Sequence, residues 1–252
     1  MSAHFADLTY EEAESLVAAG AHALLPTGAV EAHGPHLPLD TDVIIAREAA
    51  ARAVAQLASV GVRATVLPPI AYSVAEYAAG FGGTLSLPEP TVRAYVRDVL
   101  VAAHRRGFRS IVVCNAHLEP ANLGMLRAAT DEAVAVGATV VFPDVTRKPH
   151  ALRLGDEFRT GACHAGQYET SLVMAAPGTR VREAIRVGLA DNLASLSVAI
   201  REGKRTFEDA GGPRAYFGWP ERASVDEGNR LYTELADIFA AAVRKRPDAP
   251  RL

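Results

Sequence analysis

The chain has 252 residues, of which 49% are hydrophobic and 22% are charged, and its formal net charge at pH 7 is -3. This composition fits one large α/β domain over residues 1–252, and the small net charge gives no sign of a nucleic-acid or anionic-membrane partner. Two cysteines are too few for a disulfide framework. With no signal-type N-terminus and no apolar run of roughly 20 residues, we expect a soluble, cytoplasmic protein.

Most of the chain alternates between strand-like and helix-like segments. Thr9, followed three residues later by Glu12, is a capping-box pattern that predicts a helix through Ala19. Apolar runs predict strands at 21–26, 63–67, 110–114 and 138–142, and Ala-rich or amphipathic stretches predict helices at 42–58, 90–106 and 121–136. This alternation indicates the α/β class, with a mainly parallel sheet covered on both faces.

The remaining segments are less regular. We expect a long loop at 70–83, an irregular polar segment at 147–161 and a Gly- and Pro-rich connection at 210–220. Helices are predicted at 168–175, 189–202 and 226–244. No internal repeat and no linker indicates a second domain.

The stretch PTGAVEAHGPHLPLDTD, at 26–42, is rich in side chains that bind metals. It contains Glu31, His33, His36, Asp40 and Asp42, and carboxylate and imidazole groups bind zinc, manganese or iron. Ligands in open α/β sheets collect beyond the carboxyl ends of the strands. Because this stretch follows a predicted strand, it is a candidate metal site.

A second candidate, NAHLE at 115–119, directly follows the strand predicted at 110–114. In extended backbone, residues two apart point to the same side, which pairs Glu31 with His33 and His117 with Glu119. The two pairs would face one another if the strands are neighbours.

Asp42, at the start of the next predicted helix, offers two oxygens that can bridge two ions. Two metals held in this way activate a water and polarise a carbonyl. The residues therefore predict a two-metal site with five ligands: Glu31, His33, Asp42, His117 and Glu119.

A third element, HAGQYETS at 164–171, places a histidine before a glycine and then a carboxylate at the start of a helix. His164, with an ordinary pKa of about 6.5, is a candidate acid that protonates a leaving amine near pH 7. Glu169 either orients the water or coordinates a metal.

Simpler interpretations exist for several of these residues. His36 can hydrogen-bond the backbone of its own loop, and Asp40 can cap the following helix. His117 and Glu119 can mark a helix N-terminus, where the helix dipole favours a carboxylate. Cys163 lies beside His164 but has no evident partner, which favours an incidental thiol.

Read together, GAVEAHGPHLPLDTD, NAHLEPAN and HAGQYETS resemble the creatininase (creatinine amidohydrolase) family. PPIAY at 68–72 and GGTLSL at 82–87 fall in the family's order and spacing. The resemblance covers most of the chain, from about Leu24 to Ala175.

This resemblance implies a three-layer α/β/α fold with a dinuclear site, assembled as a homohexamer. It implies that Glu31, Asp42 and His117 hold one metal and that His33, Asp42 and Glu119 hold the other. His164 and Glu169 match positions that line the reacting centre, and supporting roles fall to His36, Asp40 and Asn115.

The sequence departs from true creatininase where the substrate binds. Leu118 stands in place of an aromatic residue, and Thr160 and Gly161 stand in place of a Trp-Asp pair. In the loop at 70–83, Ala75 and Tyr77 occupy places that usually carry other residues. Ala75, Tyr77 and Leu118 are therefore expected to set specificity, and creatinine is not the expected substrate.

We therefore expect a hydrolase with two divalent ions (Zn, Mn or Fe) that cleaves an amide-type, non-peptide C–N bond of a small, cyclic or acyclic substrate. Alternatives are a peptide-trimming hydrolase of the mycofactocin type, a formamide deformylase and a C–C or ester hydrolase of an oxidised polyol. The alternative from another class is a metal-free binding protein on the same fold.

Overall fold

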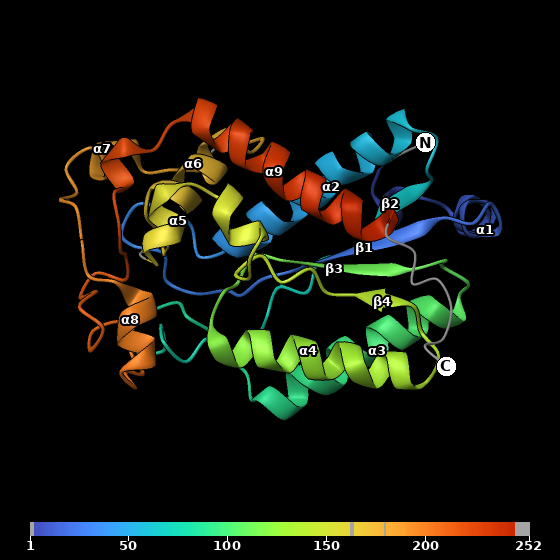
Figure 1. Cartoon of the computed structure of the whole chain (residues 1–252), viewed down its shortest axis with the longest axis horizontal. Helices are drawn as coiled ribbons and strands as arrows, with labels where there is room; N and C mark the ends of the chain where they lie inside the picture. Colours follow the sequence, from blue (N-terminus) through green and yellow to red (C-terminus); the bar gives the residue numbers. More distant parts are fainter. Residues whose placement is uncertain (1–2, 162–163, 179, 245–252) are drawn as a thin grey trace.

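A computed structural model describes residues 3–161, 164–178 and 180–244 of the chain. Its elements form three layers, with a sheet between two groups of helices (Figure 1). The strands are β1 (His22–Thr27), β2 (Ala64–Val66), β3 (Ile111–Asn115) and β4 (Val140–Val141). The long helices are α1 (Tyr10–Ala18), α2 (Thr41–Ser59), α3 (Glu89–Arg105), α4 (Pro120–Ala135), α6 (Gln167–Ala175) and α9 (Val225–Arg244).

Short helices complete the fold. Three are α-helical, α5 (Asp156–Thr160), α7 (Glu183–Arg186) and α8 (Leu196–Arg201), and three are 3-10 turns, η1 (Phe5–Asp7), η2 (His150–Arg153) and η3 (Pro220–Arg222). In Figure 1, α5, α7 and α8 lie at one end of the sheet and α1 lies at the other. No described helix is long and apolar enough to cross a membrane.

The sheet is parallel, with strand order β2-β1-β3-β4. The central strands β1 and β3 are buried on both faces, and successive side chains enter opposite cores. Leu24 and Val112 pack with α2, α6 and α9, whereas Leu25 and Val113 pack with α3 and α4. This two-sided burial explains why the strands read as continuous apolar runs. The α/β class and the sandwich architecture expected from the sequence are confirmed.

The pairing of β1 with β3 brings the first two candidate loops together. Pro26 pairs with Cys114 and Thr27 with Asn115, at the carboxyl ends of both strands. The residues that follow, 28–40 and 116–119, therefore leave the sheet side by side although they lie far apart in sequence.

The structure differs from the sequence predictions in the less regular segments. The stretch 147–161, expected to be irregular, contains η2 and α5, and α7 was not predicted at all. The helix expected at 189–202 is reduced to α8, because Asn192 exchanges two backbone hydrogen bonds with Gly218 and so cannot be helical. The capping box of Thr9 and Glu12 is present as expected.

Candidate metal centre

The candidate site lies at the carboxyl end of the sheet, where the loop after β1, the start of α2, the loop after β3 and the start of α6 meet. Gly28 makes this meeting possible, because a Cβ atom there would lie 2.6 Å from the Cβ of Asp42. The absence of a side chain lets the first turn of α2 approach the end of β1.

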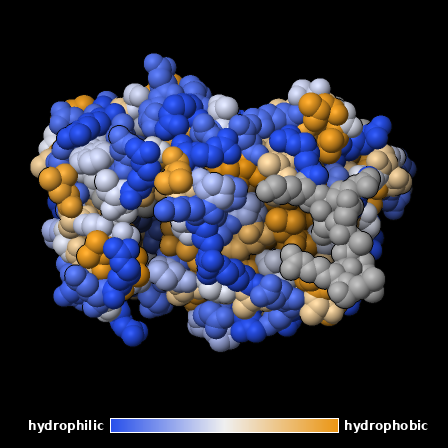
Figure 2. Space-filling model, viewed as in Figure 1, coloured by the Kyte–Doolittle hydropathy of each residue, from blue (hydrophilic) through white to orange (hydrophobic). Residues whose placement is uncertain are grey.

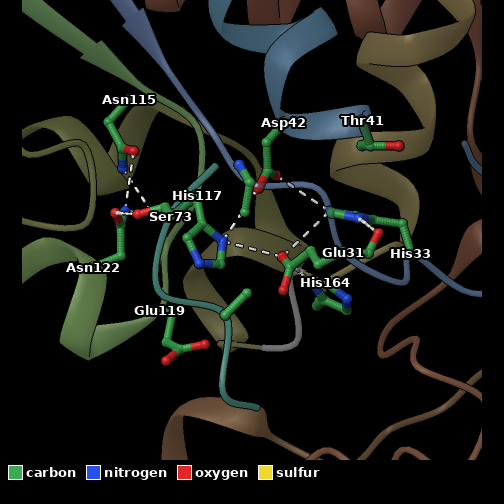
Figure 3. Close-up of polar contacts among 12 residues, drawn as sticks. Glu31, His33, Thr41, Asp42, Ser73, Asn115, His117, Glu119, Asn122 and His164 are labelled. Atoms are coloured by element: carbon green, nitrogen blue, oxygen red, sulfur yellow. Dashed lines mark hydrogen bonds and ion pairs between the residues drawn. The ribbon is translucent and has the colours of Figure 1, made fainter. Parts of the chain in front are cut away.

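Asp42 lies at the centre of the cluster and faces two histidines at once. Its Oδ1 is 3.2 Å from Nε2 of His33, and its Oδ2 is 3.2 Å from Nδ1 of His117 (Figure 3). Glu31 lies beside the same histidines, with Oε1 3.1 Å from Nδ1 of His117 and 3.8 Å from Nε2 of His33. The two oxygens of the Asp42 carboxylate thus face the nitrogens of two different histidines, as the oxygens of a bridging ligand do.

Three imidazole rings are oriented by the main chain. Nδ1 of His33 contacts the carbonyl oxygen of Glu31 at 3.1 Å, Nε2 of His117 that of Val74 at 2.7 Å, and Nε2 of His164 that of Ala32 at 2.9 Å. A carbonyl only accepts, so each outer nitrogen is an N–H donor. The inner nitrogen of each ring therefore faces the carboxylates, the arrangement typical of metal-binding histidines.

Glu169 completes the group around His33. Its Oε2 is 3.6 Å from Nε2 of His33 and accepts a hydrogen bond from the amide of Ala165 at 2.6 Å. A carboxylate oxygen of Glu169 therefore lies within reach of the ligand atoms of His33 and Asp42.

Glu119, expected beside His33, lies elsewhere. Its carboxylate oxygens accept hydrogen bonds from the amides of Glu76 and Tyr77, both at 3.2 Å, and Figure 3 shows it apart from the dashed contacts around Asp42. Two amide donors of the loop at 70–83 thus hold this carboxylate. The structure places Glu169, not Glu119, in the group with His33 and Asp42.

The described side chains form buried clusters that are able to bind metal ions. Three sets of ligand atoms lie within 4.8 Å of one another, namely Glu31-Asp42-His117, His33-Asp42-Glu169 and Glu31-His33-His164, and all of these residues are buried. Oε2 of Glu31 is buried and has no hydrogen-bond partner among the described residues. Buried carboxylates without enough donors are costly unless a cation balances them, and mixed oxygen and nitrogen donors suit zinc, manganese and iron.

Without a metal, protons balance these carboxylates. Burial disfavours the charged form of His33, but Asp42 and Glu169 outweigh this effect and raise the pKa of His33 to about 10. Burial raises the pKa of the Glu169 carboxyl to about 8, although His33 opposes the shift. The pKa of His117 is also raised well above its usual value, because Glu31 and Asp42 overcome its burial.

His164 differs from the other two rings. Burial, together with the charge of His33, lowers its pKa to about 4, so the ring is neutral near pH 7. Its Nδ1 is 4.0 Å from Oε1 of Glu31, and its ring contacts His33 and Phe207 with centroid distances of 4.4 and 4.2 Å. The expectation that His164 starts as a proton donor near pH 7 therefore changes, because the neutral ring presents a lone pair to the site.

The three residues expected in supporting roles have different surroundings. Nε2 of His36 lies 2.8 Å from Oγ1 of Thr170, so His36 contacts a side chain of α6 and not the backbone of its own loop. Asp40 precedes α2 but makes no capping bond with its side chain and instead pairs with Arg180 at 3.1 Å. Asn115 donates to the carbonyl of His117 at 2.6 Å and so fixes the loop after β3.

A cavity of about 390 Å³ opens beside the cluster and is lined by Glu31, Asp42, His117, Glu119, His164 and Glu169. Tyr77 and Leu118 line the cavity, whereas Ala75 is buried and is not among the residues that line it. Sequence reasoning missed Phe207 and the contribution of α8, both of which line the cavity. No motif marks these residues, since only the folding of distant segments brings them to the cavity.

Comparison with known proteins agrees with this geometry. A family model described as Creatininase: Creatinine amidohydrolase matches residues 6–243. The mycofactocin precursor peptide peptidase of Mycobacterium ulcerans (strain Agy99) is 30% identical over 236 residues, which are 90% of this chain and 86% of that protein. The creatinine amidohydrolase of Pseudomonas putida is 34% identical, but over only 45% of this chain and 44% of that protein.

Solved structures show the same fold. A creatinine amidohydrolase (creatininase) crystal structure matches with a TM-score of 0.78 and 25% identity, covering 98% of this chain and 99% of that one. A structure named Creatininase Mn matches with the same TM-score of 0.78 and 24% identity, over 97% of this chain and 98% of that one. From the family match, the relatives and the fold together, the chain belongs to the creatinine amidohydrolase (creatininase) family of hydrolases.

Proposed function

We propose that the protein is an amidohydrolase that uses two divalent cations to hydrolyse an amide C–N bond. The observation that carries this proposal is the position of Asp42, whose two oxygens face His33 and His117 on either side. Glu31, Asp42 and His117 would hold one ion, and His33, Asp42 and Glu169 the other. When bound, such a pair lowers the pKa of a water and polarises the carbonyl that the water attacks.

The chain's own residues then move the protons. Amide hydrolysis adds a water oxygen to the carbonyl carbon, breaks the C–N bond and delivers a proton to the departing nitrogen. His164 is neutral, and its Nδ1 lone pair faces Glu31 at the cavity, so it first accepts a proton from the water and then returns it to the nitrogen. The hydrogen bond from Nε2 to Ala32 fixes the ring during both steps.

Glu119 has a separate role in this proposal. It lines the cavity next to His117, and two backbone amides fix its carboxylate. A carboxylate held in this way orients the attacking water or the amide N–H of the substrate. Glu119 thus serves the reaction without holding an ion.

A peptide-like amide is supported as a substrate alongside a small non-peptide amide. The relatives matched over most of this chain are named as peptide peptidases, whereas the named creatinine amidohydrolase is matched over less than half. Leu118, Thr160 and Gly161 also lack the aromatic and acidic groups with which a small polar ring would be held. A homohexameric assembly and a cytoplasmic location stay predictions from the sequence.

The test is metal analysis together with turnover. The full-length protein, expressed with added zinc or manganese, is expected to contain two ions per chain and to hydrolyse at least one member of a panel of lactams, hydantoins, formamides and short peptides. Asp42→Asn removes the shared ligand, so we expect it to lose both ions. Mutation of residues that hydrogen-bond to metal ligands lowers metal affinity or activity by up to roughly 100-fold. The loss of activity in Asp42→Asn should be larger than this.

Asp40→Asn is the matched control, because it is the same chemical change two residues away. Among the described residues, the ion-pair partner of Asp40 is Arg180. It should keep both ions and its activity. Absence of metal from the wild-type protein after supplemented expression would contradict the two-metal proposal.

A further inference from the structure

The cavity beside the cluster has one apolar wall. The wall is built by the loop before α4, the start of α4, η2, α5 and α8, through Leu118, Leu123, Leu152, Phe158, Leu196 and Ile200. A volume of about 390 Å³ lies within the range that holds a drug-sized ligand. Leu152 is 51% exposed, so this wall presents apolar surface that a ligand would cover. Figure 2 shows one face of the molecule, on which hydrophobic residues lie between hydrophilic ones.

The acidic and basic side chains that line the cavity lie in different parts of it. All four lining carboxylates, Glu31, Asp42, Glu119 and Glu169, lie at or next to the cluster. The proposed ions and the backbone amides that hold Glu119 account for these four groups. None of the other described residues that line the cavity is acidic. A positively charged substrate group would therefore find no free carboxylate on the wall.

The wall carries two basic residues, Lys148 and Arg159. Arg159 is paired with Asp156 on its own helix, so its charge is balanced. Lys148 is exposed, and within residues 3–161, 164–178 and 180–244 no carboxylate lies within ion-pair distance of its ammonium group. The single unbalanced charge of the described wall is therefore positive.

We propose that the substrate is an amide with a bulky apolar group, which packs on this wall, and a carboxylate, which the ammonium of Lys148 binds. This inference rests on the proposed amide hydrolysis at the adjacent cluster. Two sources share this chemistry, an N-acyl amino acid with an aliphatic chain and a peptide that ends in an apolar residue with a free carboxylate. The positive wall excludes basic ring compounds as good substrates, since nothing there balances their charge.

The first test measures binding without turnover. The probes are 4-phenylbutyrate and its neutral amide, 4-phenylbutyramide, titrated by calorimetry into the full-length, metal-loaded protein. A partly exposed ion pair favours the carboxylate by about fivefold. Lys148→Met is expected to abolish this preference, and Lys204→Met to retain it, because Lys204 is exposed and does not line the cavity.

Two outcomes overturn the proposal. Equal affinity of the wild-type protein for the two probes would show that the wall does not select an anion. A preference that persists in Lys148→Met would show that the carboxylate binds elsewhere, for example at the cluster. Both results are obtained whether or not any amide is hydrolysed, so they remain separate from failure of the proposed function.

The second test distinguishes the two sources by turnover. N-decanoylglycine represents the acyl amino acids, and acetyl-Leu-Phe represents the peptides, each compared with its C-terminal carboxamide. For the class of substrate that the protein hydrolyses, we expect kcat/KM to be about fivefold higher for the free acid than for its carboxamide. This difference should be lost in Lys148→Met. Equal kcat/KM for acid and carboxamide in both series would overturn it while leaving amide hydrolysis intact.

Discussion

The metal cluster and the apolar wall of the same cavity are built in opposite ways. The cluster comes from loops that leave paired strands, its side chains are buried, and main-chain groups fix its rings. The wall comes from short helices, where Leu152 is exposed and Lys148 has no acidic partner among the described residues. In the proposed function, the buried cluster with its main-chain hydrogen bonds carries the chemistry and the more exposed wall carries the selectivity.

Between the cluster and the wall, the largest effect is expected for the two glutamates Glu169 and Glu119, whose substitution should change metal content and turnover differently. Glu169→Gln should lose one of two ions, because its carboxylate belongs to the group with His33 and Asp42. Glu119→Gln should keep both ions and lose turnover, because amides hold its carboxylate outside that group. The measurement is metal content per chain beside kcat. If Glu119→Gln lost an ion and Glu169→Gln kept both, Glu119 and not Glu169 would be the metal ligand.

A second prediction concerns pH. The carboxylates raise the pKa of His33 to about 10, and burial raises that of Glu169 to about 8, so both groups carry protons in the metal-free protein near pH 7. A cation must displace these protons, and metal affinity is therefore expected to fall as the pH is lowered. Each proton released changes the apparent affinity by about tenfold per pH unit below these pKa values.

Calorimetry of metal binding in two buffers with different ionisation enthalpies counts these protons directly. Release of one or more protons per ion near pH 7 is the expected result. Affinity that stays constant between about pH 6 and 7 would mean that the inner nitrogens of the rings are already free.

The smallest expected effect lies in the wall. Leu152→Ala removes apolar surface from a side chain that is 51% exposed, so the fold should tolerate it. We expect a ligand to bury at most two of the carbons that this change removes, and each buried CH₂ contributes about 0.8 kcal/mol. We expect kcat/KM for an apolar amide to fall about three- to tenfold at unchanged metal content. A loss of metal in this variant would contradict the claim that the wall does not contribute to metal binding.

The same division explains how much the sequence could predict. The strands that hold the cluster are continuous apolar runs because both faces are buried, and most of the ligand residues follow them directly. Glu119 was expected to bind metal because His117 lies two residues away. Its actual partners, the amides of Glu76 and Tyr77, belong to a loop without a recognisable pattern.

Leu118 in the wall was predicted from the sequence, but the helices that build the rest of the wall were not. Helices α5 and α8 are five and six residues long, too short for a repeating apolar pattern. Residues 189–195 resemble a helix locally, but the pairing of Asn192 with Gly218 depends on a segment that is distant in sequence. The contact of Phe207 with His164 likewise arises only in the folded chain.

The acceptors that hold the three rings are carbonyl groups of Glu31, Ala32 and Val74. Every residue type carries a carbonyl, so exchange of a side chain does not remove the acceptor. The ring orientations are inherited from the path of the backbone, and sequence drift in the wall leaves them in place. A protein built in this way can acquire new substrates over evolution, or in a directed library, while its reaction stays the same.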